Sequence, residues 1–200
     1  MIRMTGEPVD LVGHSYGGAV ALRIAQEETQ MVRSLTLIEP VAFYLLRDGN
    51  EEDRAAFSEI ADIADSVSRA GANPDDPNGM RQFVEYWNGE GAWKILDVDK
   101  RKALNELAPV VARNFLTTMW ETLPSTAFSR MTAPTVIVRG AHSTAPAIRI
   151  AAKLSSLLPG ASLITYPDGG HMLPNSHPVE IAGVISLARG NVANEEELTA

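Results

Sequence analysis

Short apolar runs alternate with amphipathic stretches near both ends of the chain, and this pattern predicts an α/β fold. The run Val9 to Val12 follows Pro8 and is expected to be a buried strand. A glycine-rich turn over 13–18 precedes an expected buried helix over 19–28, and a second strand is expected over 34–38. Strand, tight turn, helix and strand together form a βαβ unit with parallel strands.

The same alternation returns in the last third of the chain. A strand is expected over 135–139, and a helix is expected to begin at Pro146. A further strand is expected over 162–166, and the apolar positions of 179–187 predict the final helix. We expect the acidic segment 191–200 to be a flexible tail.

The stretch between these two parts has helical periodicity. Asn50 is a candidate N-cap for an amphipathic helix within it. Few connections inside a compact domain are as long as 41–131, and those that are usually have a function. We therefore predict an α/β protein of three layers, α/β/α, around a mostly parallel sheet. Its core is expected to comprise 1–40 and 132–190, with 41–131 as an inserted helical cap.

Composition narrows the function mainly by exclusion. The chain of 200 residues has no cysteine, which excludes disulfides, thiolate metal sites and a cysteine nucleophile. Its formal net charge is −8 without a basic stripe, so no nucleic-acid partner is expected. We see neither a signal peptide nor an apolar run near the ~20 residues that a membrane helix needs. A cytoplasmic protein without a membrane partner is therefore expected.

The motif that carries chemistry is GHSYG, over 13–17, which fits the pattern G-x-S-x-G. It lies between an expected strand and an expected helix, the context in which a strained turn holds a serine hydroxyl clear of a sheet edge. Small residues at Gly13 and Gly17 are expected to prevent clashes at this turn. The N–H of Tyr16 would then point at a developing oxyanion. We predict Ser15 as a nucleophile, with a surface serine on a glycine-rich turn as the alternative.

A serine nucleophile needs a general base, and the chain has four histidines. His171 follows the last strand, at the sheet edge where a base serving Ser15 is expected. His177 precedes a proline at a helix start, as capping residues do, and His142 follows an earlier strand. His14 is expected to point away from the serine hydroxyl and is a candidate for substrate binding. We predict His171 as the base, with a structural loop histidine as the alternative.

In chain order, four segments stand out: VDLVGHSYGG, SLTLIEP, APTVIVRG and YPDGGHMLPNSHP. They resemble the nucleophile elbow, the next strand, the penultimate strand and the histidine loop of the α/β-hydrolase family. This family includes esterases, epoxide hydrolases, C–C bond hydrolases and haloalkane dehalogenases. The resemblance implies an α/β-hydrolase fold with Ser15 and His171 as catalytic residues. The segment 41–131 resembles the family's helical cap only in position and character.

The chain departs from the family at the acid that should orient the base. The family usually has Asp just after the penultimate strand, where this chain has Ser143, and a serine cannot stabilise an imidazolium as a carboxylate does. Glu39 ends the strand after the elbow helix, a position that can carry the acid in related haloalkane dehalogenases. Since adjacent strand ends converge on one crevice, Glu39 is predicted as the acid. Asp168 and a Ser–His pair without an acid are the alternatives.

A second departure concerns the strands that precede the elbow in the family. Their loop, often carrying His-Gly, supplies a second oxyanion N–H, but only about eight residues precede the first strand here. The resemblance therefore implies an N-terminally truncated core whose first strand is an exposed apolar edge. Loss of one oxyanion donor costs on the order of 10²–10³ in turnover in a well-studied protease. A fragment or misassigned start and a truncated paralogue both stay open.

The expected activity is hydrolysis of a small or medium apolar ester, or a related acyl compound, through a covalent acyl-enzyme. Such an enzyme would be carboxylesterase-like and would act on ester or C–C bonds. Trp87 and Trp93 are candidates for lining the substrate pocket, with core packing as the alternative. Neither a cofactor nor a metal site is expected, because the histidines lack helix-face spacing with carboxylates. The expected partner is the small-molecule substrate, and homo-oligomerisation stays open. The alternative function is a weakly active or non-catalytic ligand-binding paralogue of the same fold.

Overall fold

The computed structural model describes residues 2–73, 78–122 and 125–199, and of 125 and 190–199 only the backbone. The chain divides into two compact units. The sheet unit comprises Met1–Val41, Thr122–Ser143 and Ala147–Ala200, and the helical unit comprises Ala42–Glu121 and Thr144–Pro146.

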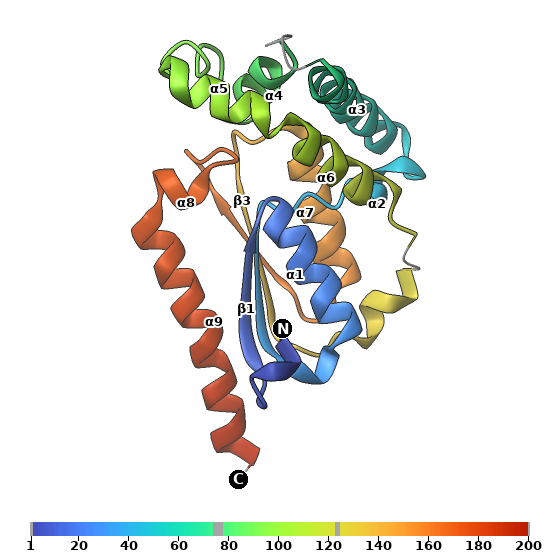
Figure 1. Ribbon diagram of the computed structural model, residues 1–200. Coiled ribbons are helices and arrows are strands. Elements are labelled where there is room, and N and C mark those ends of the chain that lie inside the picture. Colours follow the sequence, from blue (N-terminus) through green and yellow to red (C-terminus); the bar gives the residue numbers. More distant parts are fainter. Residues whose placement is uncertain (1, 74–77, 123–124, 200) are drawn as a thin grey trace. The chain divides into compact units, whose positions relative to one another are not determined.

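The sheet unit is built on a four-stranded parallel sheet (Figure 1). Its strands are β1 (Val9–His14), β2 (Val32–Ile38), β3 (Thr135–Gly140) and β4 (Ser162–Tyr166), hydrogen-bonded in the order β1-β2-β3-β4. Each connection is a crossover, because parallel neighbours cannot be joined by a tight hairpin. The predicted α/β class with a parallel sheet is confirmed, and the carboxyl ends of all four strands lie at one edge.

Helices cover both faces of this sheet, which gives the predicted three layers (Figure 1). Helices α1 (Tyr16–Glu27) and α7 (Ala145–Leu157) lie on one side, and α9 (Pro178–Thr199) lies on the other. Side chains alternate between the faces along each strand. Ile38 and Val138 pack with the α9 residues Ile181 and Val184. Short segments complete the unit: α8 (Leu173–Ser176), η1 (Ile2–Met4), η2 (Thr29–Met31) and η3 (Ser125–Arg130).

The strand β1 is an edge of the described sheet, because β2 is its only partner there. Val12 in this strand is 41% exposed, although a central strand of a parallel sheet is normally covered on both faces. This is the partly exposed apolar edge that the sequence predicts.

The helical unit consists of five helices in its described residues: α2 (Tyr44–Arg47), α3 (Glu51–Ala72), α4 (Asn78–Asn88), α5 (Val98–Glu106) and α6 (Ala108–Trp120). The predicted N-cap is confirmed. The Asn50 side chain accepts a hydrogen bond from Asp53 N–H at 2.9 Å, and the Asp53 carboxylate accepts one from Asn50 N–H. This capping box satisfies two N–H groups that have no partner inside the helix.

The C-terminal part differs from the sequence prediction in secondary structure. Helix α9 continues to Thr199 instead of ending near 187, and helix formers such as Ala193, Glu195 and Leu198 favour this continuation. The flexibility expected for 191–200 stays a prediction. None of the described helices is both long and apolar enough to cross a membrane.

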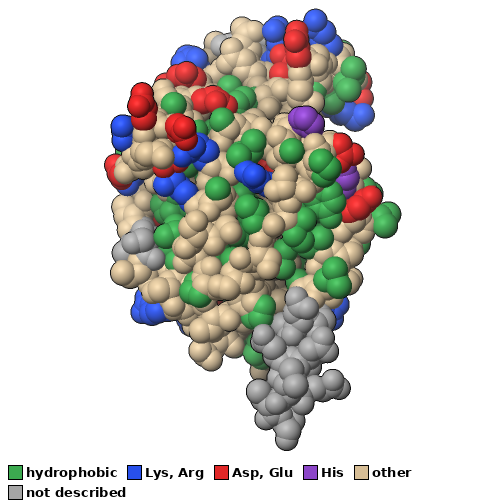
Figure 2. Space-filling model, turned by 180° about the vertical axis from the view of Figure 1, so that it is seen from behind, with side chains coloured by type: hydrophobic (Ala, Val, Ile, Leu, Met, Phe, Trp, Pro, Cys, Tyr) green, Lys and Arg blue, Asp and Glu red, His purple; other side chains and the backbone are tan. Residues whose placement is uncertain are grey.

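The distribution of charge can be followed on one face of the molecule. In Figure 2, Lys and Arg side chains are interspersed with Asp and Glu side chains over the described part of this face. Such mixing is typical of a solvated surface and gives no single-sign field. The expectation that nucleic acid is not a partner stays a prediction.

Candidate active site

The strand-to-helix turn after β1 holds Ser15 in a strained backbone conformation. Its φ is 54° and its ψ is −121°, in the region that non-glycine residues rarely adopt. Ser15 N–H donates to the Ile38 carbonyl at 3.0 Å, and the Ser15 carbonyl accepts from Gly18 N–H at 2.9 Å. These bonds join the turn to the end of β2 and to the first turn of α1. They hold the turn in place against its strain.

Of the two glycines expected to prevent clashes at this turn, Gly13 does so and Gly17 does not. A Cβ at Gly13 would lie 2.3 Å from the Gly17 carbonyl oxygen, so any side chain there would collide with backbone. A Cβ at Gly18 would lie 3.0 Å from Pro40. At Gly17 no described atom outside its chain neighbours and its own helix backbone lies within 4 Å of the same position, so the prediction that Gly17 must be small to avoid a clash is wrong. Instead, the position that must be small in α1 is Gly18, because the helix approaches Pro40 closely there.

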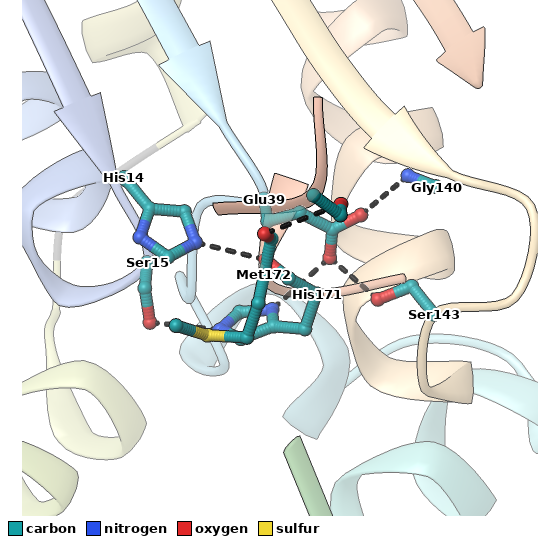
Figure 3. Close-up of polar contacts among 8 residues, drawn as sticks. His14, Ser15, Glu39, Gly140, Ser143, His171 and Met172 are labelled. Carbon is teal, nitrogen blue, oxygen red and sulfur yellow. Dashed lines mark hydrogen bonds and ion pairs between the residues drawn. The ribbon is translucent and has the colours of Figure 1, made fainter. Parts of the chain in front are cut away.

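The hydroxyl of Ser15 meets the imidazole of His171 across the carboxyl edge of the sheet (Figure 3). The distance from Ser15 Oγ to His171 Nε2 is 3.0 Å, although 156 residues separate the two in the chain. His171 is 5% exposed and lies between β4 and α8. Its loop packs tightly on β3, because a Cβ at Gly140 would lie 2.2 Å from the Gly169 carbonyl oxygen.

Glu39 lies on the other side of the same imidazole. Its Oε2 is 3.1 Å from His171 Nδ1, and the side chain is fully buried. Glu39 also has a positive φ of 48°, as Ser15 does. A buried carboxylate is costly unless its oxygens accept hydrogen bonds. Glu39 accepts two more, from Gly140 N–H at 2.6 Å and from Ser143 Oγ–H at 2.5 Å (Figure 3).

Sequence reasoning did not foresee that Ser143 would contact Glu39. Ser143 follows β3 at the position where the α/β-hydrolase family usually has its acid. Its position in the chain could therefore have indicated a contact with the site, although a serine side chain does not. The hydroxyl can donate only one hydrogen, and the carboxylate is the acceptor. Ser143 and Gly140 together hold the Glu39 carboxylate against His171 Nδ1.

The alternative acid, Asp168, has another partner. Its Oδ1 is 3.1 Å from His177 Nε2, and Ser176 Oγ is 2.7 Å from His177 Nδ1. The hydrogen bond from His177 lowers the pKa of the exposed Asp168 carboxyl. Asp168 therefore ties the start of the histidine loop to His177, which lies beyond His171 in the chain. His142 is exposed and its backbone N–H donates to the Gly169 carbonyl at 2.9 Å.

His14 directly precedes Ser15, and its ring contacts backbone. Its Nε2 lies 2.8 Å from the His171 carbonyl oxygen, and the two ring centroids are 5.2 Å apart (Figure 3). Burial lowers the pKa of His14, and this outweighs the hydrogen bond to the His171 carbonyl, which raises it. Substrate binding by His14 stays a prediction.

The lowered pKa of His14 gives the stability of the protein a definite pH dependence. Between its ordinary value of 6.5 and its lower folded value, the unfolded chain binds more protons than the folded one. The contribution of His14 to stability is therefore complete above 6.5 and is lost as the pH falls. We expect the free energy of unfolding, measured in urea, to fall less for a His14→Gln variant than for the wild type when the pH is lowered from about 7.5 to about 5.5. An equal loss in both proteins would contradict this.

Of the remaining predicted site residues, Tyr16 and Trp87 lie on helices and Trp93 lies in the turn between α4 and α5. Tyr16 begins α1, and its backbone N–H is one of the four at a helix N-terminus without an intrahelical acceptor. Trp87 and Trp93 belong to the helical unit and are 8% and 6% exposed. Trp87 packs against the Tyr86 ring, and the Arg101 guanidinium lies 5.9 Å from the centre of the Trp93 ring. This burial favours core packing, and substrate contact by either tryptophan stays a prediction.

No cluster of potential metal ligands occurs among the residues that the structure describes. The side chains that the structure brings together are a hydroxyl, an imidazole and a carboxylate in one hydrogen-bonded row. Such a row can remove a proton from the hydroxyl while the carboxylate stabilises the resulting imidazolium. This arrangement and the three-layer parallel fold define a candidate hydrolase of the α/β type.

Comparison with known proteins agrees with this class. A model of the alpha/beta hydrolase family matches residues 2–184. Lipase LipV of Mycobacterium tuberculosis is 26% identical over 198 residues, covering 92% of this chain and 69% of that protein. A hydrolase from Pseudomonas aeruginosa has a TM-score of 0.71 at 18% identity, covering 94% of this chain and 67% of that one. An esterase from Exiguobacterium antarcticum has a TM-score of 0.69 at 16% identity, covering 94% and 69%.

The chain belongs to the alpha/beta hydrolase family. It spans about two thirds of the length of the relatives that it matches.

Proposed function

We propose that this chain is a serine hydrolase in which Ser15 is the nucleophile, His171 the general base and Glu39 the acid. The observation that carries the proposal is the hydrogen-bonded row Ser15–His171–Glu39, with distances of 3.0 Å and 3.1 Å. A surface serine on a glycine-rich turn would need neither the backbone strain at Ser15 nor a buried imidazole.

In this mechanism, Ser15 Oγ attacks the acyl carbon as its proton passes to His171 Nε2. The carbonyl oxygen becomes an oxyanion, which Tyr16 N–H stabilises at the start of α1. When the tetrahedral intermediate collapses, the bond to the leaving alkoxide breaks and His171 returns the proton to it. Water then attacks the acyl-enzyme by the same steps, releasing a carboxylic acid and free Ser15. Glu39 keeps Nδ1 protonated, so that Nε2 is the nitrogen that accepts.

The substrate that we propose is a small or medium apolar ester or a related acyl compound. A lipase and an esterase among the similar proteins support an ester rather than another acyl bond. A serine in place of an aspartate nucleophile favours an acyl-enzyme over the alkyl-enzyme of a dehalogenase.

The test is to identify the nucleophile chemically. We expect a fluorophosphonate probe to label the protein once, with the adduct on the peptide that contains Ser15, and short p-nitrophenyl esters to show a burst of product. A Ser15→Ala variant serves as the control and should take no label. A folded wild-type protein without label or turnover would contradict the proposal and favour a non-catalytic ligand-binding role.

A further inference from the structure

His14 has a contact that the proposed catalytic row does not use. It is the last residue of β1, and its half-buried ring reaches the main chain of His171, 157 residues away. The distance from His14 Nε2 to the His171 carbonyl oxygen is 2.8 Å, which is a normal hydrogen bond. Figure 3 shows this contact on the main chain of His171, while the His171 side chain meets Ser15 and Glu39.

The direction of this bond follows from its acceptor. A carbonyl oxygen only accepts, so His14 Nε2 must carry the hydrogen. In the neutral ring, Nδ1 is then left without a proton and cannot compete for the same acceptor. The titratable groups that act on His14 are His171 and Glu39, and burial is the main cause that lowers the pKa of His14. An uncharged ring matters, because a second imidazolium 5.2 Å from His171 would oppose the charge that His171 takes up.

We propose that His14 is a positioning residue, whose ring N–H fixes the main chain of His171 so that the imidazole stays in line with Ser15. This inference rests on the proposed function. Two glycines, Gly169 and Gly170, directly precede the anchored residue His171. The Gly169 backbone is bonded to Tyr166 and His142, but Gly170, with the backbone freedom of glycine, lies between it and His171, and the bond from His14 acts at His171 itself. Displacement by only about 1 Å can cost 10²-fold in rate.

Two amide substitutions at His14, to Gln and to Asn, distinguish the effect of the hydrogen bond from the effect of having a polar side chain at this position. In His14→Gln the amide nitrogen can take the place of Nε2, whereas in His14→Asn it is one methylene too short. We expect the Gln variant to keep kcat close to that of the wild type. The Asn variant should lose roughly 10- to 100-fold in kcat with KM nearly unchanged, and fluorophosphonate should label its Ser15 correspondingly more slowly. Unfolding midpoints are measured for both, so that a folding defect is seen separately.

Several results would overturn the inference. Equal kcat in both variants would remove the need for the hydrogen bond, and a raised KM at constant kcat would instead indicate substrate binding by His14. Hydrogen exchange over 169–173 tests the tie without any turnover, with faster exchange expected in the Asn variant only. If the wild type is inactive, the proposed function fails while the exchange measurement still decides the role of His14. Unchanged exchange in the Asn variant would contradict it.

Discussion

Glu39→Gln is expected to reduce kcat by roughly 10³- to 10⁴-fold while the protein stays folded. The substitution keeps the shape of the side chain and the same positive-φ backbone, and changes only charge and hydrogen-bond direction. A Gln nitrogen facing His171 Nδ1 would present a donor to a donor. The imidazole would then shift to the tautomer with the hydrogen on Nε2, which cannot accept the proton of Ser15.

The measurement is kcat on a short p-nitrophenyl ester, together with the rate of fluorophosphonate labelling at Ser15. Asp168→Asn is the matched control, because it neutralises the other acid near the histidine loop but should leave kcat close to the wild-type value. Ser143→Ala removes only one of the three hydrogen bonds to Glu39 and should have an effect between these two. If Glu39→Gln retained nearly full activity, Glu39 would be a structural strand-end residue and the row would act as a Ser–His pair.

Gly13→Ala is expected to destabilise the fold by about 1–3 kcal/mol and to reduce the rate of Ser15 labelling at least ~10²-fold. The added methyl group would lie 2.3 Å from the Gly17 carbonyl oxygen and 2.8 Å from Gly18 Cα. Both are backbone atoms, so no side-chain rotation can relieve the overlap. The strand-to-helix turn must open, and Ser15 Oγ moves with it.

Gly17→Ala is the control that separates this collision from a general effect of adding a methyl group near Ser15. Gly17 lies within α1, and its Cβ would meet no described atom within 4 Å apart from its chain neighbours and its own helix backbone. Alanine in a helix is favoured over glycine by roughly 1 kcal/mol, so this variant should be as stable as the wild type or more so. For both variants we would measure the free energy of unfolding in urea and the rate of fluorophosphonate labelling at Ser15. Similar losses in the two would contradict the assigned contact.

The elements of the sheet could be predicted from sequence because each is a short apolar run followed by an amphipathic stretch. The strand over 162–166 has the predicted bounds, while β2 begins at Val32 rather than at 34. Helix α1 begins at Tyr16, three residues before the prediction, because the glycines of the turn have weak helix propensity and indicate a loop. Their weak helix propensity is overridden by the close approach of Gly18 to Pro40.

The meeting of Ser15, Glu39 and His171 at one sheet edge could also be predicted, but the contacts around them could not. Parallel strand ends meet at one edge, which is enough to bring Ser15, Glu39 and His171 to the same place. The hydroxyl of Ser143 on Glu39 and the ring of His14 on the His171 carbonyl depend on rotamers and on chain segments that are 104 and 157 residues apart. Neither periodicity nor motif spacing contains that information.

Both Ser15 and Glu39 belong to the single unit β1–α1–β2, and the helical unit enters the chain only after Glu39. The covalent path between these two side chains is therefore short and does not pass through 42–121. The entropic cost of closing a loop grows only slowly with its length, so gains or losses of residues in that stretch would leave this path untouched. Changes in the length of 42–121 therefore need not disturb the relation between Ser15 and Glu39. His171 is the member of the row that follows this stretch in the chain.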